Sequence, residues 1–438
     1  MTDSLTKIEL TNGLTVLLKE IHTSPIISEW IWYRVGSRDE IAGITVISHW
    51  VEHMQFKGTP TFPAGVLDKS ISREGGFWNA MTYLDWTTYF VVMPADKIDL
   101  ALRLEADRMV NSIFDEDMVA SERTVIISER QGSENEPLFL LGEALQAAAF
   151  RVHSYHHEVI GDLVDLYTIT RDDLYNHYRS FYVPNNAVLA ISGDFNTDAM
   201  LKQVRELFEP IPGGVIPKRR ARPEPPQKGE IRVNVEGLGE TTYLQIAYHV
   251  PEASDSDFFP LTVIDSLLTG PSSLNMFGGG ISNKTSRLYK ALVEKELAIS
   301  IQGGLQATID PYLYGITVVL HPQHSVEEVL EVIDREINII QQEPPPGADL
   351  TRAVKQARAL FAYGSESTTN QGFWMGFSEM YSTYAWFENY LNNLSSVTPQ
   401  DVQKMAQKYF LPKNRIVGVY SPVNTQGIDN PHNNFYEG

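Results

Sequence analysis

The chain of 438 residues contains no cysteine, so it has neither a disulfide framework nor a thiolate to act as nucleophile or metal ligand. Any bound metal must therefore be held by histidine and carboxylate side chains. Long apolar runs are also missing, and no segment reaches the length that spans a bilayer. Residues 1–7 lack the apolar run after a basic segment that marks a signal peptide. The sequence therefore predicts a cytoplasmic protein without membrane contact, unless a leader was removed before residue 1.

Positive charge is scarce as well. The chain has 35 lysines and arginines against 55 aspartates and glutamates, which gives a net charge of −20. This excess of negative charge argues against a nucleic-acid partner. It would steer cationic peptides toward the chain, although solubility alone is the simpler explanation. The apolar content of 43% is that of an ordinary globular protein.

The length exceeds that of one ordinary domain, and an internal repeat divides the chain. Each copy predicts a helix with a threonine cap, an aromatic end, a turn that contains proline, and a strand. We therefore expect two homologous halves, 1–211 and 230–438, joined by a linker rich in proline and arginine, 212–229. The repeated residues, each pair 228 positions apart, are Thr170, Asp173, Leu174, Phe181, Tyr182, Pro184 and Asn186 in the first copy and Thr398, Asp401, Val402, Tyr409, Phe410, Pro412 and Asn414 in the second.

Strand-like runs mixed with helix pairs predict the fold class. Residues 8–18 read as a hairpin around Asn12-Gly13, and further β-rich runs alternate with amphipathic segments in both halves. This pattern favours an α+β protein in which each half is a mostly antiparallel sheet with helices on one face.

Five residues, His49-Trp50-Val51-Glu52-His53, carry the strongest functional signal in the chain. Two histidines four apart lie on one face of a helix, and Glu52 falls beside that face. Neutral imidazoles one turn apart can share a tetrahedral Zn²⁺, and a neighbouring carboxylate can take a proton from water that the metal activates. The order H-x-x-E-H is the inverted form of the zinc-peptidase motif. Because the pattern is short, the alternative is a surface helix that carries these side chains by chance.

A second helix, expected over 117–131, places two carboxylates, Glu122 and Glu129, in an apolar stripe. A carboxylate turned toward a core needs a cation or donors to offset its desolvation, and a zinc ion with two histidine ligands would supply that charge. The alternative is an exposed stripe in which both glutamates lie in water or pair with Arg123 or Arg130. The stripe consists of Met118, Glu122, Val125, Ile126 and Glu129.

His49, Glu52 and His53, followed by Glu122 and Glu129, resemble the pitrilysin/insulinase family of inverted-motif metallopeptidases. In that family a glutamate about 75 residues after the second histidine is the third metal ligand, and Glu129 lies 76 residues after His53. A second glutamate seven residues earlier, here Glu122, typically contacts a ligand rather than the metal. The resemblance covers most of the chain and is closest to the two-domain bacterial and mitochondrial processing peptidases. It implies one Zn²⁺ per chain.

Residues 79–89 resemble the family's N-A-x-T-x-x-D-x-T-x-Y segment. In the family this segment forms the edge strand to which substrate backbone adds, so the resemblance assigns substrate binding to Asn79 and to the backbone of Ala80. The family's two halves enclose a chamber that admits unfolded peptides. The resemblance therefore implies cleavage of unfolded or presequence-like peptides in a closed chamber. The matching residues are Asn79, Ala80, Met81, Thr82, Asp85, Thr87 and Tyr89.

The second half has no H-x-x-E-H and departs from the family at one further place. Relatives that act through this half carry an arginine and a tyrosine, seven apart, in a segment that resembles L-R-x-K-x-G-L-A-Y. This chain has Val293 and Ile299 at those positions, with the intervening segment one residue short, and apolar side chains cannot donate to an oxyanion. We therefore expect a heterodimer in which this chain carries the zinc and a homologous subunit without zinc supplies the missing groups. In the alternative, a self-sufficient enzyme, Tyr312 or Tyr314 would serve as donors.

Together these residues predict a zinc-dependent endopeptidase in which His49, His53 and Glu129 hold the metal and Glu52 is the general base. Two other classes of protein fit part of the pattern. A non-catalytic core or scaffold subunit derived from a peptidase usually loses part of the zinc motif, whereas the motif is complete here. A zinc hydrolase of non-peptide substrates would not need the strand segment around Asn79.

Overall fold

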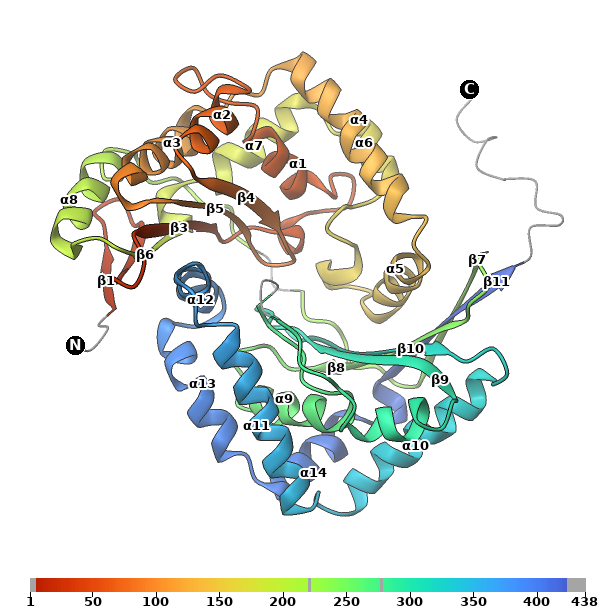
Figure 1. The fold of residues 1–438 in the computed structure, drawn as a ribbon. Coiled ribbons are helices and arrows are strands. Elements are labelled where there is room, and N and C mark those ends of the chain that lie inside the picture. The colour runs from red at the N-terminus through yellow and green to blue at the C-terminus, as the bar shows by residue number, and fades with distance from the viewer. Residues whose placement is uncertain (1–4, 220–221, 276–278, 424–438) are drawn as a thin grey trace, which may run out of the picture.

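The computed structural model describes residues 5–219, 222–275 and 279–423. They form two halves, each with one β-sheet and a set of helices, which lie one above the other in Figure 1. Both sheets are mostly antiparallel, with one parallel pair of strands each. The predicted α+β class with two sandwich-like halves is confirmed.

The first sheet has six strands, whose spatial order is β1-β2-β6-β3-β5-β4. Strands β2 and β6 are its parallel pair. The strands are β1 (Thr6–Glu9), β2 (Thr15–Glu20), β3 (Ile26–Tyr33), β4 (Phe77–Thr82), β5 (Thr87–Pro94) and β6 (Ala187–Gly193). The helices of this half are α1 (Ile47–Met54), α2 (Val66–Arg73), α3 (Ile98–Asn111), α4 (Glu116–Ser133), α5 (Pro137–Ala149), α6 (Leu163–Thr168), α7 (Arg171–Phe181) and α8 (Thr197–Phe208), with single turns at Ser37–Asp39, Ala95–Lys97, Ser154–His156 and Pro184–Asn186.

The second sheet has five strands in the order β7-β11-β8-β10-β9, and β7 and β11 are its parallel pair. The strands are β7 (Ile231–Leu238), β8 (Tyr243–Val250), β9 (Ala298–Leu305), β10 (Tyr312–Leu320) and β11 (Arg415–Val423). The helices of this half are α9 (Phe258–Leu268), α10 (Val326–Gln342), α11 (Gly347–Tyr363), α12 (Thr368–Tyr381), α13 (Tyr384–Ser396) and α14 (Pro399–Tyr409), with short turns at Tyr289–Val293 and Pro412–Asn414.

The two copies of the internal repeat occupy equivalent places in the two sheets. β6 lies between β2 and β3, and β11 lies between β7 and β8. The preceding helices, α7 and α14, both begin with a threonine–aspartate capping box. The side-chain amides of Asn186 and Asn414 then donate to the carbonyl of the last helical residue, Phe181 or Tyr409. The repeated sequence therefore encodes the same helix–turn–strand unit twice.

One face of the first sheet packs against helices of its own half. Ile27, Ile31 and Tyr33 of β3 share a core with Trp50 and Val51 of α1. In the second half, alternating residues of β8 face a second core, to which α9 and α14 contribute. The apolar back of α1 is thus buried against the first sheet, which leaves its histidine face to the outside of that core.

The other face of each sheet is covered by a helix from the opposite half. α12 packs on β3 and β6 of the first sheet, and α5 packs on β7, β8 and β11 of the second (Figure 1). Two glycines let α12 approach closely, because Cβ atoms on Gly372 and Gly376 would lie 2.6 Å from Trp30 and 2.0 Å from Trp32. Each sheet therefore carries its own helices on one face and an exchanged helix on the other, an arrangement that sequence periodicity did not predict.

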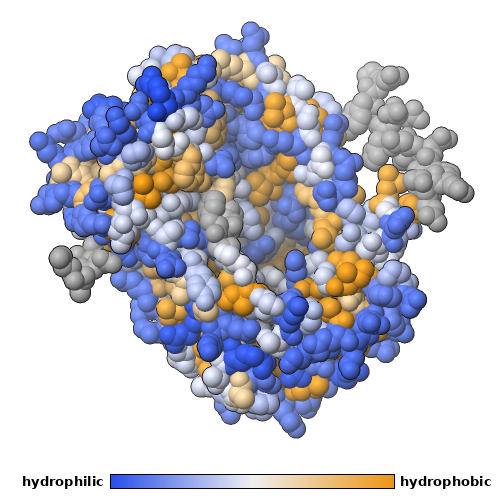
Figure 2. Space-filling view, in the orientation of Figure 1, coloured by the Kyte–Doolittle hydropathy of each residue, from blue (hydrophilic) through white to orange (hydrophobic). Residues whose placement is uncertain are grey.

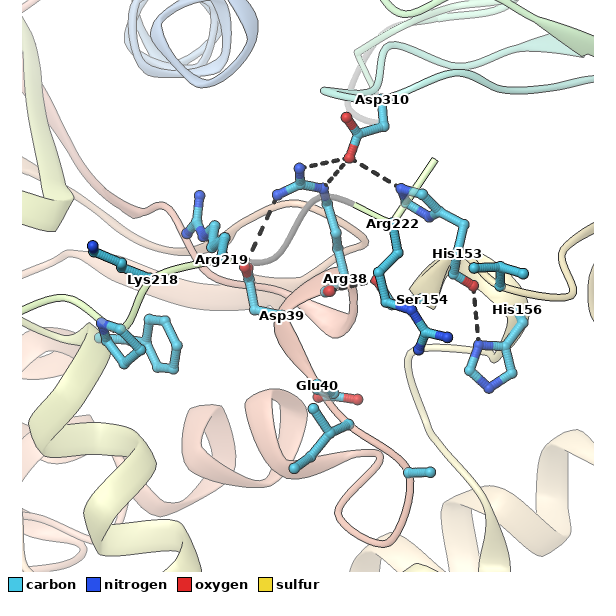
Figure 3. A pocket seen from close by; sticks show the side chains of 15 residues that line it. Arg38, Asp39, Glu40, His153, Ser154, His156, Lys218, Arg219, Arg222 and Asp310 are labelled. Atoms are coloured by element: carbon cyan, nitrogen blue, oxygen red, sulfur yellow. Dashed lines mark hydrogen bonds and ion pairs between the residues drawn. The ribbon is translucent and has the colours of Figure 1, made fainter. Parts of the chain in front are cut away.

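Polar contacts join the two halves beside a cavity of about 600 Å³. Arg38 of the first half donates from Nε to Oδ2 of Asp310 in the second half at 2.6 Å, and Nε2 of His153 lies 3.0 Å from the same oxygen (Figure 3). Asp85 accepts from the hydroxyl of Tyr155 at 2.7 Å and also from a backbone N–H of the second half. These buried and partly buried bonds fix the two halves relative to each other.

The surface is hollowed between the two halves, at the centre of the face in Figure 2. α1 and β4 lie on the first-half side of this hollow (Figure 1). Among the described residues, the helices are all too short or too polar to cross a membrane.

Candidate metal centre

Helix α1 begins with an unusual backbone conformation that buried carboxylates hold in place. Val46, just before the helix, has a φ of 75°, in the left-handed region that β-branched residues rarely adopt. Glu40 accepts hydrogen bonds from the backbone N–H groups of Val46 and Ser48, both at 2.9 Å. It thereby caps the N-terminus of α1, where the first N–H groups have no acceptor within the helix. Asp165 accepts from both the N–H and the hydroxyl of Thr45. These bonds fix the direction in which α1 leaves the loop.

The two histidines of α1 direct their Nε2 atoms at the same point. These atoms lie 3.2 Å apart, and the two rings are nearly perpendicular. Burial, together with the neighbouring His53, lowers the pKa of His49 to about 3, so this ring is neutral. A neutral imidazole is the form that binds a metal.

Helix α4 brings a carboxylate to this point. Oε2 of Glu129 lies 3.7 Å from Nε2 of His53, and the Glu129 side chain is 43% exposed. Three or more histidine, cysteine or acidic side chains that lie close together can share a metal ion. Among the described residues, His49, His53 and Glu129 form the one such group, and their ligand atoms all lie within 4.8 Å of one another. The structure therefore brings together the three side chains that the sequence predicts as metal ligands.

Glu122, two turns earlier on α4, contacts the far side of the His53 ring. Its Oε1 lies 2.9 Å from Nδ1 of His53, and its other oxygen pairs with Lys57. Burial raises the pKa of Glu122, but the bonds from His53 and Lys57 outweigh burial and leave it lowered. Burial lowers the pKa of His53, and here the bond to Glu122 and the charge of Glu129 outweigh burial and leave it raised. Because Nδ1–H donates to Glu122, the lone pair of Nε2 is free to face the site.

The two arginines of α4 are engaged elsewhere. Arg123 lies over the ring of Trp50, 4.9 Å from its centre. Arg130 pairs with Glu134 and Glu143. The alternative in which these arginines neutralise the glutamates of the stripe therefore does not hold.

Glu52 is buried beside the histidines, with 8% of its surface exposed. Its Oε2 accepts a hydrogen bond from Oγ1 of Thr82 on β4 at 2.6 Å. Burial raises the pKa of Glu52 to about 7, against the opposing effects of the Thr82 bond and of His53. A carboxyl group with such a pKa can both take up and release a proton near neutral pH.

The geometry of this donor set fits zinc. Two nitrogens bound to one zinc ion at about 2.0–2.1 Å in a tetrahedron lie roughly 3.3 Å apart, and the two Nε2 atoms lie 3.2 Å apart. Two histidines and one carboxylate leave the fourth position open, as catalytic zinc sites require. Nδ1 of His49 is buried and has no hydrogen-bond partner among the described residues, so it can carry the ring proton when Nε2 binds a metal.

Asn79 and Ala80 lie on β4, an edge strand of the first sheet. Asn79 is exposed, and its Oδ1 accepts from the backbone N–H of Ala80 at 2.9 Å. This N–H therefore points away from β5 and toward the open edge. Thr82, further along the same strand, contacts Glu52. One strand thus links the open edge to the buried carboxyl group.

The residues of the second half that depart from the family pattern, and the two tyrosines considered as alternative donors, lie in different environments. Ile299 lies on β9 with 55% of its surface exposed. Val293 ends the turn Tyr289–Val293 and packs against the core of the second half. Tyr312 and Tyr314 are buried, with 8% and 1% exposed, and the hydroxyl of Tyr314 lies 3.3 Å from that of Thr269 in the interior.

Sequence reasoning missed three side chains that support the site. Lys57 lies in the turn beyond the end of α1 at Met54, so helical spacing gives no signal for its contact with Glu122. Thr82 stands in the strand motif, but its contact with Glu52 depends on how β4 lies against α1. Glu40 caps α1 only because the intervening loop closes back on the helix, for which the sequence carries no local signal.

Two family models match the chain, "Insulinase (Peptidase family M16)" over residues 15–163 and "Peptidase M16 inactive domain" over residues 168–357. An uncharacterized zinc protease of Mycobacterium leprae is 28% identical over 408 residues, which cover 91% of this chain and 88% of that protein. The beta subunit of a mitochondrial-processing peptidase from Lentinula edodes is 25% identical over 94% of this chain and 89% of its own. The crystal structure of a protease from Helicobacter pylori matches with a TM-score of 0.89 at 25% identity, covering 96% of this chain and all of that one.

Proposed function

Because the chain belongs to the M16 insulinase family of peptidases, we propose that it is a zinc-dependent endopeptidase that cleaves unfolded or presequence-like peptides. The observation that carries this proposal is the convergence of His49, His53 and Glu129 within 4.8 Å, with Glu52 buried beside them. Relatives named zinc proteases support it.

In this proposal, His49, His53 and Glu129 hold one Zn²⁺ per chain. Bound zinc supplies Lewis acidity, which acidifies water and polarises a peptide carbonyl. Glu122 and Lys57 keep the His53 ring oriented, since the carboxylate accepts from Nδ1 and is itself held by the ammonium group.

Glu52 acts as general base and then as general acid. It takes a proton from the attacking water and passes that proton to the amine that leaves. Its burial supports this role, because burial raises its pKa to about 7. With this pKa the carboxylate is basic enough to accept the proton from water, and the carboxylic acid is acidic enough to give it to the amine. The hydrogen bond from Thr82 keeps the carboxyl group oriented while it does so.

The substrate is an extended peptide that pairs with the open edge of β4. A peptide carbonyl would take the N–H of Ala80 in place of the Asn79 side chain, which would then be free to bond the peptide backbone. Such pairing needs an unfolded segment, because a folded protein has few free strand edges. The hollow beside α1 and β4 would receive that segment (Figure 2).

We also propose that the active form is a heterodimer with a homologous subunit that lacks zinc. The positions that would stabilise the oxyanion carry Val293 and Ile299, which have no donor groups. The buried tyrosines Tyr312 and Tyr314 do not offer a replacement at the surface. The similarity to a protein named as one subunit of a processing peptidase agrees with this arrangement.

The test is to measure zinc content and hydrolysis of an unstructured peptide on the same purified sample, for the wild type and for Glu52→Gln. We expect one zinc per chain in both proteins. We expect hydrolysis by the wild type once its partner subunit is added, and a loss of at least about 100-fold in Glu52→Gln. Near wild-type turnover in Glu52→Gln would reject the assignment of the base.

The same samples separate the alternatives. Strong, chelator-sensitive hydrolysis by the wild-type chain alone, with a mass of two chains in solution, would favour a self-sufficient homodimer. A purified chain that binds no zinc would favour a non-catalytic core or scaffold subunit.

A further inference from the structure

The end of the β4–β5 hairpin lies directly behind the proposed general base. Thr82 and Thr87 are cross-strand partners at this end. The Thr82 hydroxyl lies 2.6 Å from Oε2 of Glu52, and the hydroxyls of Thr82 and Thr87 lie 3.4 Å apart. Thr87 is fully buried and donates its own proton to the carbonyl of Val35 at 2.9 Å.

This arrangement assigns the hydroxyl protons. Thr87 uses its proton on a backbone carbonyl, which can only accept. The short contact between Thr82 and Oε2 of an ionised Glu52 therefore requires Thr82 to donate. Oε2 is then held as an acceptor, while no hydrogen bond to Oε1 occurs among the described residues. The two oxygens of Glu52 therefore differ in their hydrogen bonding: Oε2 is bonded by Thr82, and Oε1 is left to accept a proton.

We propose that Thr82 is a positioning residue that directs the transferred proton to Oε1 of Glu52. The inference rests on the proposed peptidase function and deepens it. An O–H bond of the attacking water breaks and its proton forms a bond to Oε1. When the C–N bond of the peptide breaks, the O–H bond at Oε1 breaks in turn and the proton moves to the amine nitrogen.

The position of the Thr82 hydroxyl explains why it matters which oxygen of Glu52 receives the proton. A proton on Oε2 would point at the Thr82 hydroxyl and the buried hairpin rather than at the substrate. Since Thr82 lies on the same strand as Asn79 and Ala80, one element holds both the peptide and the base in register. Effective proton transfer requires such placement, because reacting atoms must lie within hydrogen-bond reach.

Three variants test the proposal in the zinc-loaded chain with its partner subunit. Thr82→Val removes the hydroxyl and keeps a β-branched side chain of the same shape, whereas Thr82→Ser restores the hydroxyl. Thr88→Val is the control on the same hairpin, because Thr88 is a fully buried threonine whose hydroxyl, among the described residues, bonds the carbonyl of Ile31 at 2.9 Å and not Glu52.

We expect kcat of Thr82→Val to fall about 10- to 100-fold, the usual range for groups that orient an active-site residue. KM and zinc content should stay within about twofold of the wild type. Thr82→Ser should recover most of kcat, and Thr88→Val should keep it. A wild-type kcat in Thr82→Val, or an equal loss in Thr88→Val, would overturn the proposal.

Crystal structures of the variants give a readout that does not depend on turnover. In Thr82→Ser, Oε2 of Glu52 should stay within hydrogen-bond distance of residue 82, whereas in Thr82→Val the carboxyl group should rotate. An unmoved carboxyl group in Thr82→Val would overturn the positioning role even if kcat fell. If wild type and Glu52→Gln are equally inactive, the proposed function fails and this inference fails with it. If Glu52→Gln loses activity while Thr82→Val keeps the kcat of the wild type, this inference fails alone.

Discussion

Gly376 of α12 lies against the indole of Trp32 on β3 so closely that a Cβ atom on the glycine would be 2.0 Å from Nε1 of the ring. The glycine belongs to the second half and the tryptophan to the first. The contact therefore depends on the exchange of α12 between the halves, and it places the glycine where only a hydrogen atom fits. Trp32 is fully buried there.

Gly376→Ala should destabilise the protein, although alanine is the better helix former. In an open helix the change would stabilise by roughly 0.5–1 kcal/mol. Overpacking against the ring of Trp32 should cost more, so we expect a net loss of about 1–3 kcal/mol. The matched control is Gly142→Ala on α5, where a Cβ would meet only Oε1 of Gln245 at 3.8 Å. Urea unfolding measures both variants, and equal stabilisation by both would contradict the close packing.

The exchange of α5 and α12 predicts that neither half folds alone. Without the second half, Trp30 and Trp32 would lose their cover and expose a large apolar face, which favours aggregation. We expect residues 1–211 and 230–438 to be insoluble or molten when expressed separately and to form a stable complex when expressed together. Circular dichroism and thermal unfolding of each fragment measure this. A cooperative thermal transition in the isolated first fragment would contradict the prediction.

Glu122→Gln should weaken zinc binding by about 10- to 100-fold, because the variant loses the charge that holds Nδ1 of His53 and pairs with Lys57. Competition with a chromophoric chelator measures the affinity. Glu116→Gln is the control, since Glu116 is an exposed carboxylate in the first turn of the same helix. Unchanged affinity in Glu122→Gln would show that this carboxylate does not support the ligand.

The stability of the contact between the halves should depend on pH through Asp85. Burial raises the pKa of this carboxyl group from 3.8 to about 6, despite the hydrogen bond from Tyr155. Between these values the folded state binds a proton that the unfolded state has released, so stability falls as pH rises from about 4 to about 6. The fall contributed by this group is at most roughly 3 kcal/mol.

Asp85→Asn removes the titrating group, so this part of the pH dependence should be absent from the variant. Urea unfolding between pH 4 and pH 7 measures the slope for both proteins. Asp96→Asn, a change at an exposed aspartate of the same half, should keep the wild-type slope. Identical slopes in the wild type and Asp85→Asn would exclude Asp85 as the source.

The sequence by itself determined the features that follow from local spacing. Two histidines four apart and two glutamates seven apart lie on single helical faces wherever those helices are placed, because the period of the α-helix is fixed. The repeat with its capping residues predicted the same unit in both halves, and β6 and β11 occupy equivalent positions. Spacing could not predict the positive φ of Val46, because that strain is held by Glu40 across a loop.

Only the tertiary structure decided which separate segments meet. The contact of Thr82 with Glu52 and the pairing of Lys57 with Glu122 arise where β4 and α4 pack against α1. The packing of Gly376 on Trp32 joins residues more than three hundred positions apart. Helix periodicity is a property of neighbouring residues, whereas such contacts are selected by how the buried faces of the whole chain fit together. For this reason the sequence predicted the ligands of the candidate centre, and the fold revealed the groups that hold them.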